Sequence, residues 1–403
     1  MTNYITNSTN FSNIFDTSGN SDNAATTTNF KINGTDLGST YTLLGKYSNL
    51  KLGYNTNYLN NGTDLKDIFQ FKLFDYANTT AAYITLPVVS NLSYSSGNPG
   101  ILIIITSSGD IRFTRGMNNL YMYITAGGGA GGSCQNNSNA GGGGGAGGGA
   151  YGKVDVTNIT KITATIGNGG TASEGGGTSG GNSTATFYNS GGTNLASVTV
   201  YGGGSGGNGE LAGTLGGSSG GNGSFSGTAP YANDDGITAT YSTNGFSGFT
   251  EGSTGGGGGQ NNSNNRGAGG GGGGFTSSGT FGGGGVAGIG GDGISFTFTT
   301  GFLSGTPANK NTVINISGGG GGGSDSGSVG GVGKNGGGAG GSANAADEAG
   351  KRGRNALNGL LTGSTSYYYG GGGGGAANWT DGTTGGNGAK GAVILYIDST
   401  MYT

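Results

Sequence analysis

The stretch that decides the fold runs Gly109-Asp-Ile-Arg-Phe-Thr-Arg-Gly-Met-Asn-Asn-Leu-Tyr-Met-Tyr-Ile-Thr-Ala-Gly-Gly-Gly-Ala-Gly-Gly132. Within it, Leu120, Met122 and Ile124 alternate with more polar residues. Alternation with a period of two predicts a β-strand that buries one face. Glycine tracts begin directly after Ala126, so the sequence changes at this point from a strand-forming run to glycine-rich segments.

Glycine is distributed very unevenly on the two sides of this point. Only ten of the 104 glycines lie within residues 1–126. The rest of the chain is therefore about one-third glycine, against roughly 7% in an ordinary domain. Glycine loses more backbone freedom on folding than any other residue, so such a segment folds only where close backbone approach compensates.

Short β-type runs separate the glycine tracts, and a flexible linker has no reason to contain them. Collagen requires glycine at every third position with abundant proline, and this chain has four prolines. We expect polyglycine II helices whose outward N–H and C=O groups pair with neighbouring segments. The predicted fold class is therefore mainly β with a polyglycine II helix bundle, with little α-helix except a short piece within 343–361. The β-type runs are Val154–Val156, Ile162–Ile166, Val198–Tyr201, Ile294–Phe298, Val313–Ile316 and Ala392–Ile397.

The region before the strands contains a degenerate repeat. Asn7–Phe15 matches Asn61–Phe69, and Asn33–Leu37 lies between them. Asn-Gly is a tight-turn dipeptide, and the Thr or Asp that follows it is suited to cap a short helical turn. Repeated units with few apolar residues need neighbours to bury them, and in a fibre these neighbours can be other chains. The repeat is expected to be either a simple packing unit without a ligand or a docking surface for a virion or fibre partner. We predict an N-terminal repeat and assembly region over 1–84 and a strand-flanked glycine-rich domain over 85–403. The candidate assembly residues are Ile14, Phe15, Leu37, Leu65, Ile68 and Phe69.

Composition excludes several functional classes. The net charge of -3, with 16 scattered basic residues, provides no basic patch for nucleic acid. There is no histidine and one cysteine, so His-dependent catalysis, intrachain disulfides and Cys-based metal sites are not expected. The N-terminus lacks the features of a signal peptide, and the longest apolar run, Ile101–Ile105, is too short to span a membrane. We expect no enzyme activity, cofactor or metal.

Three motifs resemble binding or catalytic sites, but each has a simpler explanation. Gly331–Gly336 fits the pattern GxGxxG, but a chain so rich in glycine contains such matches by chance, and no βαβ unit surrounds it. Asp234-Asp235 lacks the spacing of a calcium loop and is expected in a solvated turn. Cys134 has no histidine to activate it.

Aromatic residues near the glycine tracts are the candidate recognition residues. Tyr367, Tyr368 and Tyr369 directly precede a tract, and Trp379 closely follows it. Tyr and Trp present large rigid surfaces with a polar group, which suits recognition of proteins or sugars. The alternative is that these rings only cover the glycine segments.

Three parts of the chain resemble the glycine-rich domain of viral and bacteriophage tail-fibre proteins. The run Gly109–Gly132 is similar to the opening of that domain, Ala150–Gly170 to its second element and Gly385–Ile397 to its closing strand. The Asn-Gly-Thr-Asp-Leu repeats look more like repeats of large DNA virus proteins, and 210–311 is longer than in the compact phage pattern. The resemblance implies a giant-virus fibre or capsid-surface protein.

We therefore expect a structural protein on the virion surface that self-associates as a trimer or filament and contacts other virion proteins. A second hypothesis is an adhesin that binds a host glycan or protein at a fibre tip. A third is an ice-binding or cell-wall protein, although the threonines lack a regular period along the sequence. Neither nucleic acid binding nor membrane insertion is expected.

Overall fold

The computed structural model describes residues 5–6, 9–10, 31–32, 35–36, 59–60, 63–64, 74–75, 83–90, 99–113, 118–134, 139–209, 211–224, 236–241, 246–257, 260–261, 267–283, 285–299, 311–324, 328–345, 348–361, 364, 366–377 and 383–398. The chain divides into two compact units, Met1–Leu73 and Phe74–Thr403. The boundary predicted from the sequence follows residue 84. That position lies inside strand β8 (Tyr83–Ser90), and the whole strand belongs to the second unit.

The described residues of the first unit form three two-stranded antiparallel sheets, one for each copy of the repeat. In every pair, only two residues separate the strands, and these are Asn7-Ser8, Asn33-Gly34 and Asn61-Gly62. Thr35–Asp36 and Thr63–Asp64 are strand residues, and the helical turn expected after them lies outside the described residues. Strands that pair across a two-residue connection form a β-hairpin, and Asn-Gly is a preferred dipeptide for that connection. The candidate assembly residues Ile14, Phe15, Leu37, Leu65, Ile68 and Phe69 lie outside the described residues. The paired strands are β1 (Ile5–Thr6) with β2 (Thr9–Asn10), β3 (Lys31–Ile32) with β4 (Thr35–Asp36), and β5 (Leu59–Asn60) with β6 (Thr63–Asp64).

The described residues of the second unit form two large sheets. The six-stranded sheet is antiparallel throughout, in the order β16-β15-β14-β13-β10-β7. Its strands are β7 (Phe74–Asp75), β10 (Gly109–Phe113), β13 (Lys161–Thr165), β14 (Ser183–Tyr188), β15 (Asn194–Val200) and β16 (Thr240–Tyr241).

The ten-stranded sheet has the order β17-β12-β11-β24-β9-β8-β20-β21-β23-β22. All its pairs are antiparallel except β21 with β23. Besides β8, its strands are β9 (Pro99–Ile105), β11 (Asn119–Thr125), β12 (Gly149–Asp155), β17 (Phe246–Gly252), β20 (Ile294–Thr299), β21 (Asn311–Ile316), β22 (Gly359–Leu360), β23 (Ser366–Tyr369) and β24 (Ala392–Asp398). A further small pair joins β18 (Gln260–Asn261) to β19 (Gly267–Ala268).

Strand β11 is buried on both faces, whereas its sequence predicts one buried face. Leu120, Met122 and Ile124 are fully buried, as predicted, and β14 of the six-stranded sheet contacts β11 and β24. Tyr123 is also fully buried, because its ring packs 4.3 Å, centroid to centroid, from Phe296 of β20. The strands β20, β21 and β23 therefore supply a second apolar layer. The residues of this second cluster are Leu102, Ile104, Tyr123, Phe296, Ile314, Ile316, Tyr367, Tyr369, Ala392, Ile394 and Tyr396.

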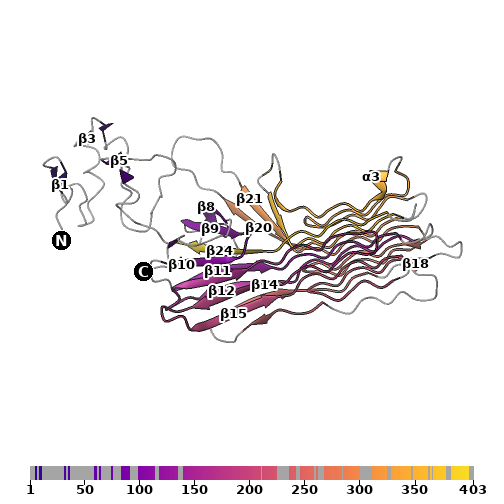
Figure 1. The fold of residues 1–403 in the computed structure, drawn as a ribbon, viewed down its shortest axis with the longest axis horizontal. Helices are drawn as coiled ribbons and strands as arrows, with labels where there is room; N and C mark the ends of the chain where they lie inside the picture. Colours follow the sequence, from indigo (N-terminus) through magenta and orange to yellow (C-terminus); the bar gives the residue numbers. More distant parts are fainter. Residues whose placement is uncertain are drawn as a thin grey trace. The chain divides into compact units, whose positions relative to one another are not determined.

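The glycine segments of the second unit run side by side away from the sheets (Figure 1). Within the described residues of this unit, the fold is mainly β with almost no helix. The charged piece at 343–361 contributes only α3 (Glu348–Lys351). Lys351 is buried and Arg352 is exposed, so the expected solvation of this charged run holds for only part of it.

Candidate functional site

The glycine segments are the main feature that the sheets hold in place, and segment 141–148 lies at their centre. Each N–H of this segment donates to a carbonyl oxygen of another segment at 2.7–2.9 Å. The acceptor segments recur with a period of three residues. The acceptors, from Gly141 to Gly148 in order, are Ala376, Gly207, Gly270, Gly373, Gly204, Gly273, Gly370 and Tyr201.

The carbonyl oxygens of the same segment accept with the same period, from three further segments. These bonds are 2.7–3.0 Å long. Segment 141–148 thus has six hydrogen-bonded neighbours, three that accept and three that donate. The donors to Gly141–Ala146 are Gly323, Gly132, Gly221, Gly320, Gly129 and Ser218, and Ala126 donates to Gly148.

Close backbone contact explains why glycine occupies these positions. A Cβ atom added at Gly144 would overlap the carbonyl oxygen of Gly129, and one added at Gly372 would overlap that of Gly144. Both obstacles are backbone atoms, which cannot rotate away as a side chain can. A larger residue at these positions would therefore separate the segments and break their hydrogen bonds.

Asparagine side chains provide further acceptors for backbone N–H groups around the glycine segments. Their Oδ1 atoms accept backbone N–H groups from residues distant in sequence, at 2.7–3.0 Å. Four of these six bonds are buried or partly buried, where an unpaired N–H would be costly, and two are exposed. The acceptor and donor pairs are Asn208 with Ser133, Asn387 with Ala172, Asn182 with Gly202, Asn222 with Gly213, Asn335 with Gly293, and Asn355 with Asn387.

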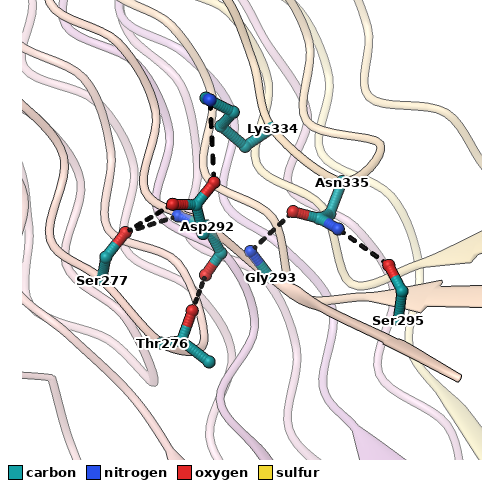
Figure 2. Close-up of polar contacts among 7 residues, drawn as sticks. All are labelled: Thr276, Ser277, Asp292, Gly293, Ser295, Lys334 and Asn335. Atoms are coloured by element: carbon teal, nitrogen blue, oxygen red, sulfur yellow. Dashed lines mark hydrogen bonds and ion pairs between the residues drawn. The ribbon is translucent and has the colours of Figure 1, made fainter.

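One polar cluster joins several glycine segments near the start of β20 (Figure 2). Asn335 Oδ1 accepts from Gly293 N at 3.0 Å, and its Nδ2 donates to Ser295 Oγ at 3.0 Å. Lys334 Nζ lies 3.7 Å from Asp292 Oδ1, and Asp292 N donates to Ser277 Oγ at 2.8 Å. The polar groups are directed mainly at one another, so the cluster connects segments and strand. The ion pair is about half exposed, so we expect it to contribute little to stability.

A second junction connects three strand ends to the glycine segments. Thr125 at the end of β11 and Ser317 after β21 share a hydrogen bond of 2.6 Å between their hydroxyl oxygens. Gly370, directly after β23, has a φ of 69°, and a Cβ there would overlap the Thr125 hydroxyl. Glycine is therefore required where β23 turns into its segment.

Two of the candidate recognition tyrosines are not at the surface. Tyr367 and Tyr369 are 7% and 1% exposed and belong to the second apolar cluster, while Tyr368 on the opposite face of β23 is half-buried. Pairing of β23 with β21 turns the two rings inward. Their burial corrects the expectation of an exposed recognition surface at these positions and fits the covering alternative. Burial also raises the pKa of both phenols. Trp379 lies outside the described residues.

The GxGxxG match and Cys134 have structural surroundings in the described residues and form no binding or catalytic site there. Gly331 and Gly333 of the GxGxxG match lie inside a glycine segment, where a Cβ would overlap carbonyls of neighbouring segments. Cys134 is buried at the end of another segment, and its N–H donates to Thr383 O at 2.9 Å. Asp234-Asp235 lies outside the described residues. Across the described ranges, no three His, Cys, Asp or Glu side chains gather as metal ligands would.

Comparison with protein-family models and with curated proteins gives no match. In the described part of the chain, no helix has the length and apolar character needed to cross a membrane.

Proposed function

We propose that the glycine segments pack as polyglycine II helices and that the chain is a structural, non-enzymatic protein of a virus particle. The observation that carries the proposal is the pairing of segment 141–148 with six neighbours at a period of three residues. A polyglycine II helix has three residues per turn and no internal hydrogen bonds, so its N–H and C=O groups point to neighbours in several directions. The observed pairing is the one expected for such a helix inside a bundle.

A fully paired bundle offers stiffness with very little apolar core. Ordering each backbone residue costs about 1–2 kcal/mol, and only nearly complete pairing together with apolar flanks offsets this cost. The two sheets supply the apolar flank at one end of the segments, and the asparagine, serine and threonine side chains supply pairing at their margins. Such a body is suited to hold loops at a fixed distance from an anchored end.

The proposed location is the virion surface, as a fibre or capsid decoration. The likeness of Gly109–Gly132, Ala150–Gly170 and Gly385–Ile397 to viral and bacteriophage fibre domains supports this location. The proposed partners are further copies of the chain and other virion proteins. The role requires neither a cofactor nor nucleic acid.

Two forms of electron microscopy test the proposal. Negative-stain images of the purified full chain are expected to show regular fibres or spikes, and gold-labelled antibodies are expected to decorate the surface of the source particles. Single compact molecules at every concentration, with no label on intact particles, would contradict it.

A further inference from the structure

Strands β8 and β24 lie on either side of the glycine segments in sequence, and both pair with β9 (Figure 1). All glycine segments of the second unit that the structure describes lie between these two strands along the chain. Before β8, the described part of this unit contains only β7, which pairs with β10 at Phe74 and Asp75 alone. Tension along the chain therefore reaches β8 and β24 before it reaches any glycine segment.

The directions of the strands decide how they respond to tension. Strand β9 is antiparallel to both β8 and β24, so β8 and β24 run in the same direction on either side of it. At one end of the ladder, Tyr83 and Val393 both pair with Ile105. At the other end, Asp398 pairs with Gly100. The chain thus enters β8 at the Tyr83 end and leaves β24 at the Asp398 end, about 17 Å further along the strands.

Tension on this arrangement pulls β8 and β24 in opposite directions along their own axes. Antiparallel hydrogen bonds lie perpendicular to the strands, so the load falls on the whole ladder at once rather than on one bond after another. Sliding would also displace side chains that are tightly packed in β9 and β24. These side chains are at most 1% exposed and belong to Leu102–Ile105 and Val393–Ile397.

Strand β24 is held on both of its edges. Besides its pairing with β9, it pairs with β11 from Ala392 to Tyr396. Removing β24 lengthwise therefore requires two ladders to shear together. The glycine segments lack such a safeguard, because they have no side chains that interlock and depend on backbone hydrogen bonds to their neighbours.

We propose that β8, β9 and β24 form a strand clamp that carries tension along the chain and keeps the glycine segments unloaded. The source of the tension rests on the proposed function, because a protein on a particle surface is pulled when the particle moves against an attached object. The clamp itself is a property of the folded chain. Its resistance is a matter of the rate of forced unfolding, which depends on the direction of the pull.

Single-molecule force spectroscopy of the full chain, held by handles at its two termini, tests the clamp. We expect a high-force event that releases the chain between Ser90 and Ala392, about 1,000 Å when extended. Events from the first unit are recognised by their shorter length, because that unit ends at Leu73.

The matched control pulls the same fold in another direction. Asn98→Cys places one handle directly before β9 while the other stays at the C-terminus, so tension enters the ladder at the pair Gly100–Asp398. The pairs then open one at a time, and we expect an unfolding force lower by at least about twofold at the same pulling speed. The native Cys134 is buried, so the handle couples at the new thiol. Equal far-UV circular dichroism and melting temperature verify that the variant folds.

Equal unfolding forces in the two directions would overturn the clamp, as would a terminal pull that releases the glycine segments in small steps at low force. The clamp and the proposed function fail separately. The expected force ratio, in a chain whose antibodies label no particle surface, would contradict the virion location alone. Equal forces in a chain that is labelled on the particle surface would overturn the clamp alone.

Discussion

A methyl group at Gly144 has no space, because the carbonyl oxygen of Gly129 occupies the position of the added Cβ. We predict that Gly144→Ala lowers the free energy of unfolding by about 2–4 kcal/mol, through overpacking and lost hydrogen bonds. Gly175→Ala is the control, since a Cβ there meets nothing within 4 Å. The control is expected to be neutral or slightly stabilising. Urea unfolding of both variants measures the difference, and equal midpoints would contradict the account of close packing.

The Asn335 side chain holds both a backbone donor and a strand hydroxyl, so its loss leaves Gly293 N without this acceptor. We predict that Asn335→Ala costs about 1–3 kcal/mol of stability. Asn168→Ala, at an exposed position, is expected to change stability by less than about 0.5 kcal/mol. Thermal unfolding of the two variants compares them, and a matching shift in both would argue against the bridging role of Asn335.

Single residues differ in how far their roles could be predicted. The need for glycine followed from its abundance, because few other arrangements tolerate one-third glycine. The role of Asn335 could not be predicted, since its partner Gly293 lies 42 residues earlier in the chain. Only the packing of segments brings the two together. Asparagine before glycine is typical of a turn, so the local sequence of Asn335 predicts a turn. It does not predict that the side chain accepts a hydrogen bond from another segment.

Strand β20 depends on Phe296, which closes the second apolar layer over Tyr123 and Tyr151, at ring distances of 4.3 and 5.3 Å. We predict that Phe296→Ala destabilises the chain by about 3–5 kcal/mol, the usual cost of truncating a buried phenylalanine. Phe281→Ala, at a 57% exposed position, serves as the control with a small effect. Chemical denaturation measures both, and a small effect at Phe296 would show that the layer contributes little.

Strand β23 makes stability sensitive to high pH through Tyr369. Burial, with Tyr367 nearby, raises the pKa of the Tyr369 phenol above its ordinary value of about 10. The folded chain therefore keeps this proton to higher pH than the unfolded chain, and stability falls as the pH rises above about 10. Tyr369→Phe removes this term and is expected to lose less stability between pH 9 and about 11. A pH series of melting temperatures that falls equally for both proteins would contradict this assignment.

The β elements divide into those that periodicity predicts and those that it does not. The runs at Ile162–Ile166, Ile294–Phe298 and Ala392–Ile397 correspond to β13, β20 and β24, since each contains large apolar residues. Strand β14 was missed because alanine and phenylalanine are its only buried apolar residues. Strand β23 was misread because three adjacent tyrosines are typical of a recognition loop, and only pairing with β21, far away in sequence, buries two of them.

For the whole second unit, the sequence predicted mainly β structure with alternating glycine tracts, and the described residues confirm the β content. The partners of each glycine segment could not be predicted, because identical residues carry no information about which segment lies beside which. The pairing of segments 285–292 and 328–335 was equally hidden, since Gly290 and Val332 become hydrogen-bonded neighbours only when the chain packs.

Amide hydrogen exchange of segment 141–148, followed by mass spectrometry or NMR, tests the central claim most directly. Because each N–H donates to another segment and every residue of the segment is buried, we predict protection comparable to that of strands β11 and β24. Exchange of these glycine amides at the rate of an unstructured peptide, with the strands still protected, would contradict the account.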